Sequence, residues 1–120
     1  MISHIDSTLI LTDNLPRLVK FYRDTLELAV LHENPRHVLL GHGSGAMIGL
    51  AQSQRIKGRT REPYRFMVSF FCEDVYGTAF ELERRGVEFS EEPYDDGDAT
   101  VATFTDPDGN ILRIINYPVS

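Results

Sequence analysis

The sequence predicts an α+β fold built from two tandem βαβββ modules. Two observations support this prediction. In each half of the chain an apolar strand pattern is followed by an amphipathic helix, and an aspartate stands just before each helix, at Asp13 and Asp74. Aspartate favours a helix N-terminus because its carboxylate accepts hydrogen bonds from free backbone N–H groups. The two strand–helix units begin about sixty residues apart, which indicates an internal repeat.

The first half of the repeat begins with a strand predicted over residues 3–12, where side chains alternate between two faces. Asp13-Asn14 then offers a helix cap, and Pro16 suits the first turn of a helix. Apolar residues three and four apart predict that this helix continues to about Leu26. Three short strands are expected after it, over 28–33, 36–41 and 46–52.

The second half repeats this pattern, with a strand predicted over 64–73 and a helix over 75–85 that stops at Gly86. Short strands are then expected over 87–90, 99–105 and 111–116. The acidic segment 91–98 interrupts them, and we interpret it as a loop. This loop is either a lid over a cationic ligand or a solvated connector.

The repeat divides a single domain into a first module over 1–52, a linker over 53–63 and a second module over 64–120. The linker is polar, and it contains four basic residues, Arg55, Lys57, Arg59 and Arg61. Two interpretations remain open. The linker is a solvated connector, or its basic cluster contacts a phosphate or a carboxylate.

The composition is that of an ordinary globular protein, with 42% hydrophobic and 25% charged residues. The formal charge of −6 argues against nucleic-acid binding, which requires a basic face. A single cysteine, Cys72, cannot form an internal disulfide, so we expect a reducing, cytoplasmic setting. No signal-peptide pattern and no apolar run of membrane-spanning length occur in the sequence, so we expect no membrane partner.

Strands covered by a helix on one side alternate between a helix-facing set and an opposite set. The predicted helix-facing set is apolar: Ile5, Leu9, Leu11, Ile48, Leu50, Phe66, Val68, Phe70, Leu112 and Ile114. The opposite set mixes charged, small, aromatic and methionine side chains, which is typical of a ligand pocket and equally of a partly solvated sheet face. Ten residues of this set are the predicted ligand-binding residues: Asp6, Thr8, Met47, Gly49, Arg65, Met67, Ser69, Phe71, Ile111 and Arg113.

Arg113 is the anomaly in the last predicted strand, which is otherwise rich in isoleucine and leucine. The strand follows Asp106-Pro107-Asp108-Gly109-Asn110, a sequence that predicts a tight turn. Arginine is rarely buried without a partner, so Arg113 either faces a wet groove or meets an acid. The sequence offers no nucleophile or general base with a supporting neighbour, so the catalytic residues, if any, are unknown.

Four features give the chain a resemblance to the vicinal oxygen chelate superfamily, which contains glyoxalase I, the bleomycin resistance proteins and the extradiol dioxygenases. They are the helix with Phe21-Tyr22-Arg23-Asp24-Thr25-Leu26 after the first strand, the repeat that begins at 64, the helix end at Arg84-Arg85-Gly86-Val87, and the 106–110 turn. The resemblance implies that the two modules form a curled mixed sheet around a cleft, with helices on the outer face. It also implies a homodimer. One departure is Glu27, where the family usually has glycine.

Metal-dependent members of this family place a ligand at one inward position on each of four strands. By the resemblance, those positions here hold Asp6, Gly49, Met67 and Arg113. Glycine has no side chain, and methionine and arginine do not bind hard divalent ions. We therefore expect no metal cofactor, and we expect Asp6 and Arg113 to form an ion pair instead.

The resemblance thus implies a metal-free protein of the bleomycin-resistance type, which sequesters a small organic molecule in a dimer cleft. The alternative is a divalent-metal-dependent lyase or isomerase like glyoxalase I, or a dioxygenase, with non-standard ligands. A structural or regulatory domain without a ligand is a third hypothesis.

Overall fold

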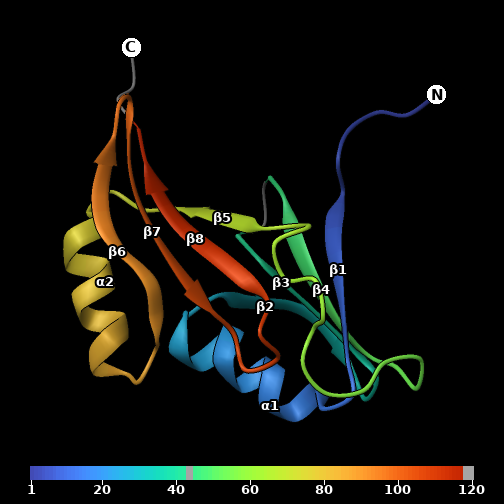
Figure 1. Ribbon diagram of the computed structural model, residues 1–120. Coiled ribbons are helices and arrows are strands. Elements are labelled where there is room, and N and C mark those ends of the chain that lie inside the picture. The colour runs from blue at the N-terminus through green and yellow to red at the C-terminus, as the bar shows by residue number, and fades with distance from the viewer. Residues whose placement is uncertain (43–44, 118–120) are drawn as a thin grey trace. The chain divides into compact units, whose positions relative to one another are not determined.

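The computed structural model describes residues 1–42 and 45–117. The chain divides into two compact units, Met1–Gly58 and Arg59–Ser120. Each unit contains a four-stranded mixed sheet and a helical segment (Figure 1). The predicted α+β fold of two tandem βαβββ modules is therefore confirmed. No helix in the described ranges is both long and apolar enough to span a membrane.

The first unit contains four strands and one helical segment. They are β1 (Ser7–Thr12), α1 (Leu15–Val19) with its π-helical continuation η1 (Lys20–Thr25), β2 (Ala29–Asn34), β3 (His37–Gly41) and β4 (Met47–Gln52). The strand order is β1-β4-β3-β2. The first strand pairs in parallel with β4, and the other neighbours are antiparallel.

The second unit repeats this arrangement. Its elements are β5 (Val68–Phe71), α2 (Val75–Arg84), β6 (Phe89–Asp96), β7 (Ala99–Thr105) and β8 (Ile111–Asn116). The strand order is β5-β8-β7-β6, with β5 parallel to β8 and the other pairs antiparallel. Helix α2 packs along the sheet of its own unit (Figure 1).

The two helices begin at side-chain caps, but only one of the predicted aspartates is the cap. Asp74 accepts a hydrogen bond from the N–H of Gly77 at 3.0 Å. In the first unit the cap is Asn14, which accepts from Arg17 N–H at 3.2 Å. Asp13 instead accepts from Gly58 N–H at 2.8 Å, so its carboxylate holds the end of the unit against the start of the helix.

Each sheet has an apolar face toward the helix of its own unit. In the first unit this face contains Val38, Leu40, Ile48 and Leu50, and the helical segment adds Leu18 and Tyr22. In the second unit it contains Ala102, Phe104, Leu112 and Ile114, with Val75, Ala79 and Leu82 from α2. All of these side chains are at most 6% exposed, which makes them the two hydrophobic cores.

The predicted helix-facing set is wrong for β1. Leu9 pairs in parallel with Gly49, and it therefore lies on the face opposite Ile48 and Leu50. Leu9 and Leu11 are 57% and 38% exposed, and Ile5 precedes the strand at 80%. The alternating pattern gave the correct period but could not tell which set of β1 faced the helix, because both sets contain apolar residues.

Phe66 was also assigned to the core and is 82% exposed, because β5 begins only at Val68. The other predicted core residues of that strand, Val68 and Phe70, pair with Leu112 and Ile114 on the helix side as expected.

The acidic segment 91–98 is not a loop, which corrects the sequence prediction. Residues 89–96 form β6, an edge strand that pairs with β7 through two register shifts. Acidic residues and a proline at position 93 are unfavourable for interior strands but common on edges, where they prevent pairing with another chain. The acidic residues of this segment therefore make an edge strand resemble a loop in the sequence.

The predicted turn between β7 and β8 is confirmed and is strongly hydrogen-bonded. Asp106, 3% exposed, accepts from the N–H groups of Asp108 at 2.9 Å and Asn110 at 3.0 Å. Its second oxygen accepts from the Asn110 side-chain amide at 2.8 Å. Gly109 follows with φ 84°, a conformation that glycine adopts without strain. This turn fixes the register in which Arg113 enters β8.

Glu27 adopts φ 61° at the end of the first helical segment, a left-handed conformation that is strained for a residue other than glycine. Among the described residues it is the only non-glycine with positive φ. The backbone cost is tolerated because Leu26 and Leu28 are anchored by hydrogen bonds to the carbonyls of Phe21 and Tyr22, at 2.9 and 3.1 Å.

We expect Glu27→Gly to raise the free energy of unfolding by about 1 kcal/mol relative to Glu27→Ala, since both variants remove the carboxylate and only glycine relieves the left-handed strain. Urea denaturation of the two variants measures this difference. Equal stability of the two would contradict the assignment of strain to residue 27.

The pKa of Glu92 is raised above its ordinary value. The largest cause is loss of hydration, and the next is a hydrogen bond with the carboxyl group of Glu83. The folded state therefore binds this proton more tightly than the unfolded state, and its stability falls as the pH rises through the raised pKa. We expect Glu92→Gln to raise Tm at pH 7 and to lose this advantage near pH 3, where Glu92 is protonated. Thermal unfolding across this range measures it.

Glu88→Gln, a substitution of another exposed glutamate in the same unit, is the matched control for this experiment. A gain in Tm for Glu92→Gln that stays constant from pH 7 to pH 3 would show that repulsion between Glu83 and Glu92 is not its cause.

Candidate functional site

Four polar side chains lie in register across the second sheet, on the face opposite α2, which we call the helix-free face. This polar row consists of Ser69 on β5, Arg113 on β8, Thr103 on β7 and Glu91 on β6. Arg113 Nε donates to Ser69 Oγ at 3.2 Å, and Thr103 Oγ1 donates to Glu91 Oε1 at 3.1 Å. The row therefore presents a cation and an anion that are each fixed by a hydroxyl neighbour.

An apolar row lies beside the polar row, two residues away on β5, β7 and β8 and three residues away on β6, where the register shifts. It consists of Phe71, Ile115, Val101 and Tyr94. Phe71 is 56% exposed and meets the ring of Tyr117 edge to face, with centroids 6.0 Å apart. An apolar and aromatic surface next to a few fixed polar groups is the usual composition of a small-molecule site.

The guanidinium of Arg113 has donors left for a ligand. Its only hydrogen bond within the described residues uses Nε, and no ion pair is formed with any of them. The predicted partner, Asp6, lies in the other unit, so an Asp6–Arg113 pair remains a hypothesis. A guanidinium with two free Nη groups binds a carboxylate, phosphate or carbonyl oxygen well.

The helix-free face of the first sheet contains Leu9, Leu39, Met47 and Gly49, together with His37, which the sequence prediction missed. A Cβ placed on Gly49 would lie 3.1 Å from His37 Nε2 and 3.2 Å from Leu9 Cδ1. The glycine therefore makes room for the imidazole. A glycine inside a strand is the signal that could have revealed this close approach.

The ten predicted ligand-binding residues do not all lie on the helix-free faces. Met47, Gly49, Ser69, Phe71, Ile111 and Arg113 lie on these faces. Thr8 pairs with Ile48 and shares its face, on the helix side. Asp6, Arg65 and Met67 precede the strands, and Arg65 is engaged by Glu62 at 3.0 Å.

The residues at the family's metal positions do not form a ligand set. Gly49 has no donor, and the space above it contains the His37 ring and the Leu9 side chain. In the described part of the chain, no three His, Cys, Asp or Glu side chains gather as metal ligands. The donor chemistry of Gly49, Met67 and Arg113 therefore does not fit a divalent ion, and we derive no chemistry through one.

Cys72 is a poor candidate for a reactive thiol. Burial, the largest influence, raises its pKa above the ordinary value. A reactive thiol requires the opposite shift, because the thiolate is the nucleophile.

Comparison with known proteins adds the family context. The family model of the Glyoxalase/Bleomycin resistance protein/Dioxygenase superfamily matches residues 4–114. The uncharacterized protein YraH of Bacillus subtilis (strain 168) is 27% identical over 119 residues, covering 88% of this chain and 91% of that protein.

Two solved structures show the same fold. TnmS3, an antibiotic binding protein from Streptomyces sp. CB03234, superposes with a TM-score of 0.81 at 21% identity and covers 98% of each chain. A glyoxalase/dioxygenase from Nostoc punctiforme gives a TM-score of 0.80 at 14% identity, over 97% of this chain and 92% of that one. At such low identities the likeness concerns the fold and leaves the ligand open.

Proposed function

Because the chain belongs to the Glyoxalase/Bleomycin resistance protein/Dioxygenase superfamily, we propose that it binds a small organic molecule on the helix-free faces of its sheets, without a divalent metal. The ligand has an apolar, partly aromatic body and an oxygen acceptor that faces Arg113. The protein sequesters this molecule and leaves it chemically unchanged.

The adjacent polar and apolar rows of the second sheet are the main observation in support. Arg113 donates a hydrogen bond to Ser69 at 3.2 Å and still has free donors. Phe71, two residues after Ser69 on β5, offers an exposed ring. A ligand that covers both rows gains apolar burial from Phe71 and charge-assisted hydrogen bonds from Arg113.

The similarity to TnmS3 supports this proposal at the level of fold, since that protein is an antibiotic binding protein. The donor chemistry of Gly49, Met67 and Arg113 supports its metal-free part. A homodimer is part of the proposal because Leu9 and Leu11 are strongly exposed on the first sheet, and association would cover such residues. We place the protein in the cytoplasm because its single cysteine suits a reducing compartment.

A divalent-metal-dependent lyase or isomerase, or a dioxygenase, remains the second candidate, because the superfamily includes such enzymes by its name. His37 is the observation that favours it. Its Nε2 lies 3.1 Å from the place that a Cβ atom on residue 49 would occupy, and residue 49 is one of the family's metal positions.

The binding proposal is tested with a thermal-shift screen of aromatic antibiotics and 2-naphthoate, followed by calorimetry of the compounds that raise Tm. We expect Arg113→Ala to weaken binding roughly tenfold to a hundredfold, because a charge-assisted hydrogen bond is lost. Phe71→Ala should weaken it as well, through lost apolar contact. Arg84→Ala on α2 is the charge-matched control.

Two results would contradict the binding proposal. One is a panel that contains no stabilising compound. The other is a compound whose affinity is the same in Arg113→Ala, Phe71→Ala and the unmodified protein, which would place its site elsewhere.

The metal-free part is tested by calorimetric titration of chelator-stripped protein with Ni²⁺, Zn²⁺, Fe²⁺ and Mn²⁺. We expect no tight binding of any of these ions, since the donor set lacks the required side chains. Tight binding of about one ion per chain, abolished by His37→Ala, would favour the enzyme alternative instead.

A further inference from the structure

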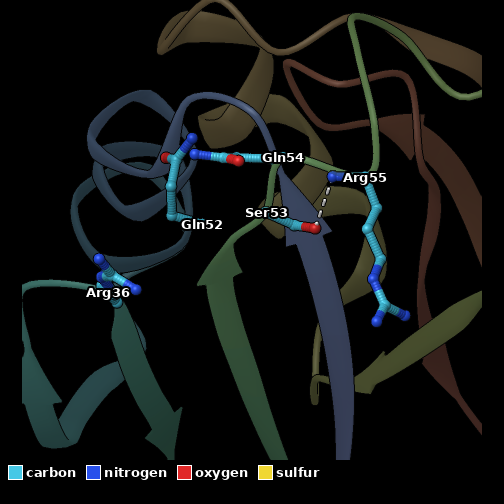
Figure 2. Close-up of a pocket in the computed structure, with 5 residues that line it drawn as sticks. All are labelled: Arg36, Gln52, Ser53, Gln54 and Arg55. Carbon is cyan, nitrogen blue, oxygen red and sulfur yellow. Dashed lines mark hydrogen bonds between the residues drawn. The ribbon is translucent and has the colours of Figure 1, made fainter.

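A second candidate site lies in the first unit, where β4 ends and β3 begins. A hollow of about 530 Å³ opens there among polar side chains (Figure 2). Its lining residues are Arg36, Gln52, Ser53, Gln54 and Arg55. The volume falls in the range of small-molecule sites, roughly 300–1,000 Å³. None of the described residues that line it is acidic, although the chain has 18 acids and 12 bases.

The base of this hollow is held by hydrogen bonds. The side chain of Gln52 accepts from Leu15 N–H at 2.9 Å and donates to the carbonyl of Asp13 at 2.8 Å. The backbone N–H of Gln52 donates to the Arg36 carbonyl at 3.0 Å, and Ser53 N–H donates to the Thr12 carbonyl at 2.9 Å. These bonds fix the Gln52 side chain and the backbone beside it, which lowers the entropic cost of binding there.

The two arginines of the hollow keep their guanidinium groups unengaged. Their backbone N–H groups donate to Asn34 Oδ1 at 3.0 Å and Ser53 Oγ at 3.1 Å. Neither guanidinium, however, forms a hydrogen bond or an ion pair with any residue in 1–42 or 45–117.

Other arginines of the same chain have acidic partners, as in the pairs Arg23–Asp24 at 2.8 Å and Arg84–Glu81 at 3.1 Å. Unpaired arginines in a hollow are well suited to an external anion, because the guanidinium fork matches carboxylate and phosphate.

The positions of the two arginines indicate the kind of anion. Figure 2 shows Arg36 and Arg55 on opposite sides of the segment that contains Gln52, Ser53 and Gln54. In this view the Arg55 side chain extends away from Gln54 and Arg36, so the two guanidinium groups do not converge on one point. A molecule with an acid group at each end can engage both, and its middle part would lie against the Gln54 amide and the Ser53 hydroxyl.

We propose that this hollow binds an organic dianion in which two acid groups, carboxylate or phosphate, are joined by a spacer. Arg36 holds one acid group and Arg55 holds the other. This site uses no residue of the helix-free faces, so it is independent of the function proposed above. It also gives the basic linker a role at Arg55, in place of that of a solvated connector.

The test is calorimetry at about 0.01 M ionic strength, where charge interactions are weakly screened. The probes are glutarate, pimelate and azelate, each compared with the monocarboxylate of equal chain length. We expect at least one diacid to bind about tenfold more tightly than its monoacid, because a second guanidinium–carboxylate pair forms. Pentanediol bisphosphate, with the spacer of pimelate, shows whether phosphate or carboxylate is preferred.

Arg36→Ala and Arg55→Ala should each reduce the affinity of the best diacid to that of its monoacid. Arg36→Lys and Arg55→Lys should retain part of the extra affinity for the diacid, since the positive charge remains while the two-pronged guanidinium is lost. Lys20→Ala is the control, because it removes one exposed positive charge from the same unit outside the hollow.

Two results would overturn the proposal. One is equal affinity for diacids and monoacids at every length. The other is an effect of Lys20→Ala as large as that of the arginine variants, which would show attraction by net charge only.

Discussion

In each unit the first strand pairs in parallel with the last, and this pairing determines which side chains lie on the helix-free face. The pairing of β1 with β4 sets Leu9 beside Gly49, and that of β5 with β8 sets Ser69 beside Arg113. Because successive side chains of a strand point to opposite faces, a shift of one residue would move the whole set to the helix side. The candidate site therefore depends on register more than on any single contact.

Two features hold this register. The Asp106 carboxylate closes the turn between β7 and β8 and so sets the residue at which β8 begins. The second feature is that β8 is paired on both sides. Arg113 pairs with Thr103 of the antiparallel strand β7 and with Ser69 of the parallel strand β5. A buried carboxylate that accepts three hydrogen bonds is costly to disrupt, which makes this turn a firm reference point for the polar row.

Function in this fold is decided by the side chains placed on a common frame. The parallel pairing that could align metal ligands here aligns Leu9 with Gly49 and Ser69 with Arg113, and the antiparallel strand β3 adds His37 over the glycine. These groups suit the recognition of an organic ligand. The hollow with Arg36 and Arg55 is a different kind of site, because it is formed at the ends of strands, where the chain reverses and the faces of the sheet no longer constrain side chains.

The sequence by itself determined the fold class, the repeat, the tight turn at 106–110 and the shared face of Ser69, Phe71, Ile111 and Arg113 on the second sheet. These features follow from local chemistry: caps, glycine and proline at turns, and the two-residue period of strands. Only the tertiary structure decided which face of β1 lies toward the helix, that the acidic segment is the edge strand β6, and that His37 lies over Gly49. The physical reason is that these three facts depend on pairing between segments far apart in the chain, and a local pattern gives the period of a strand without its partner.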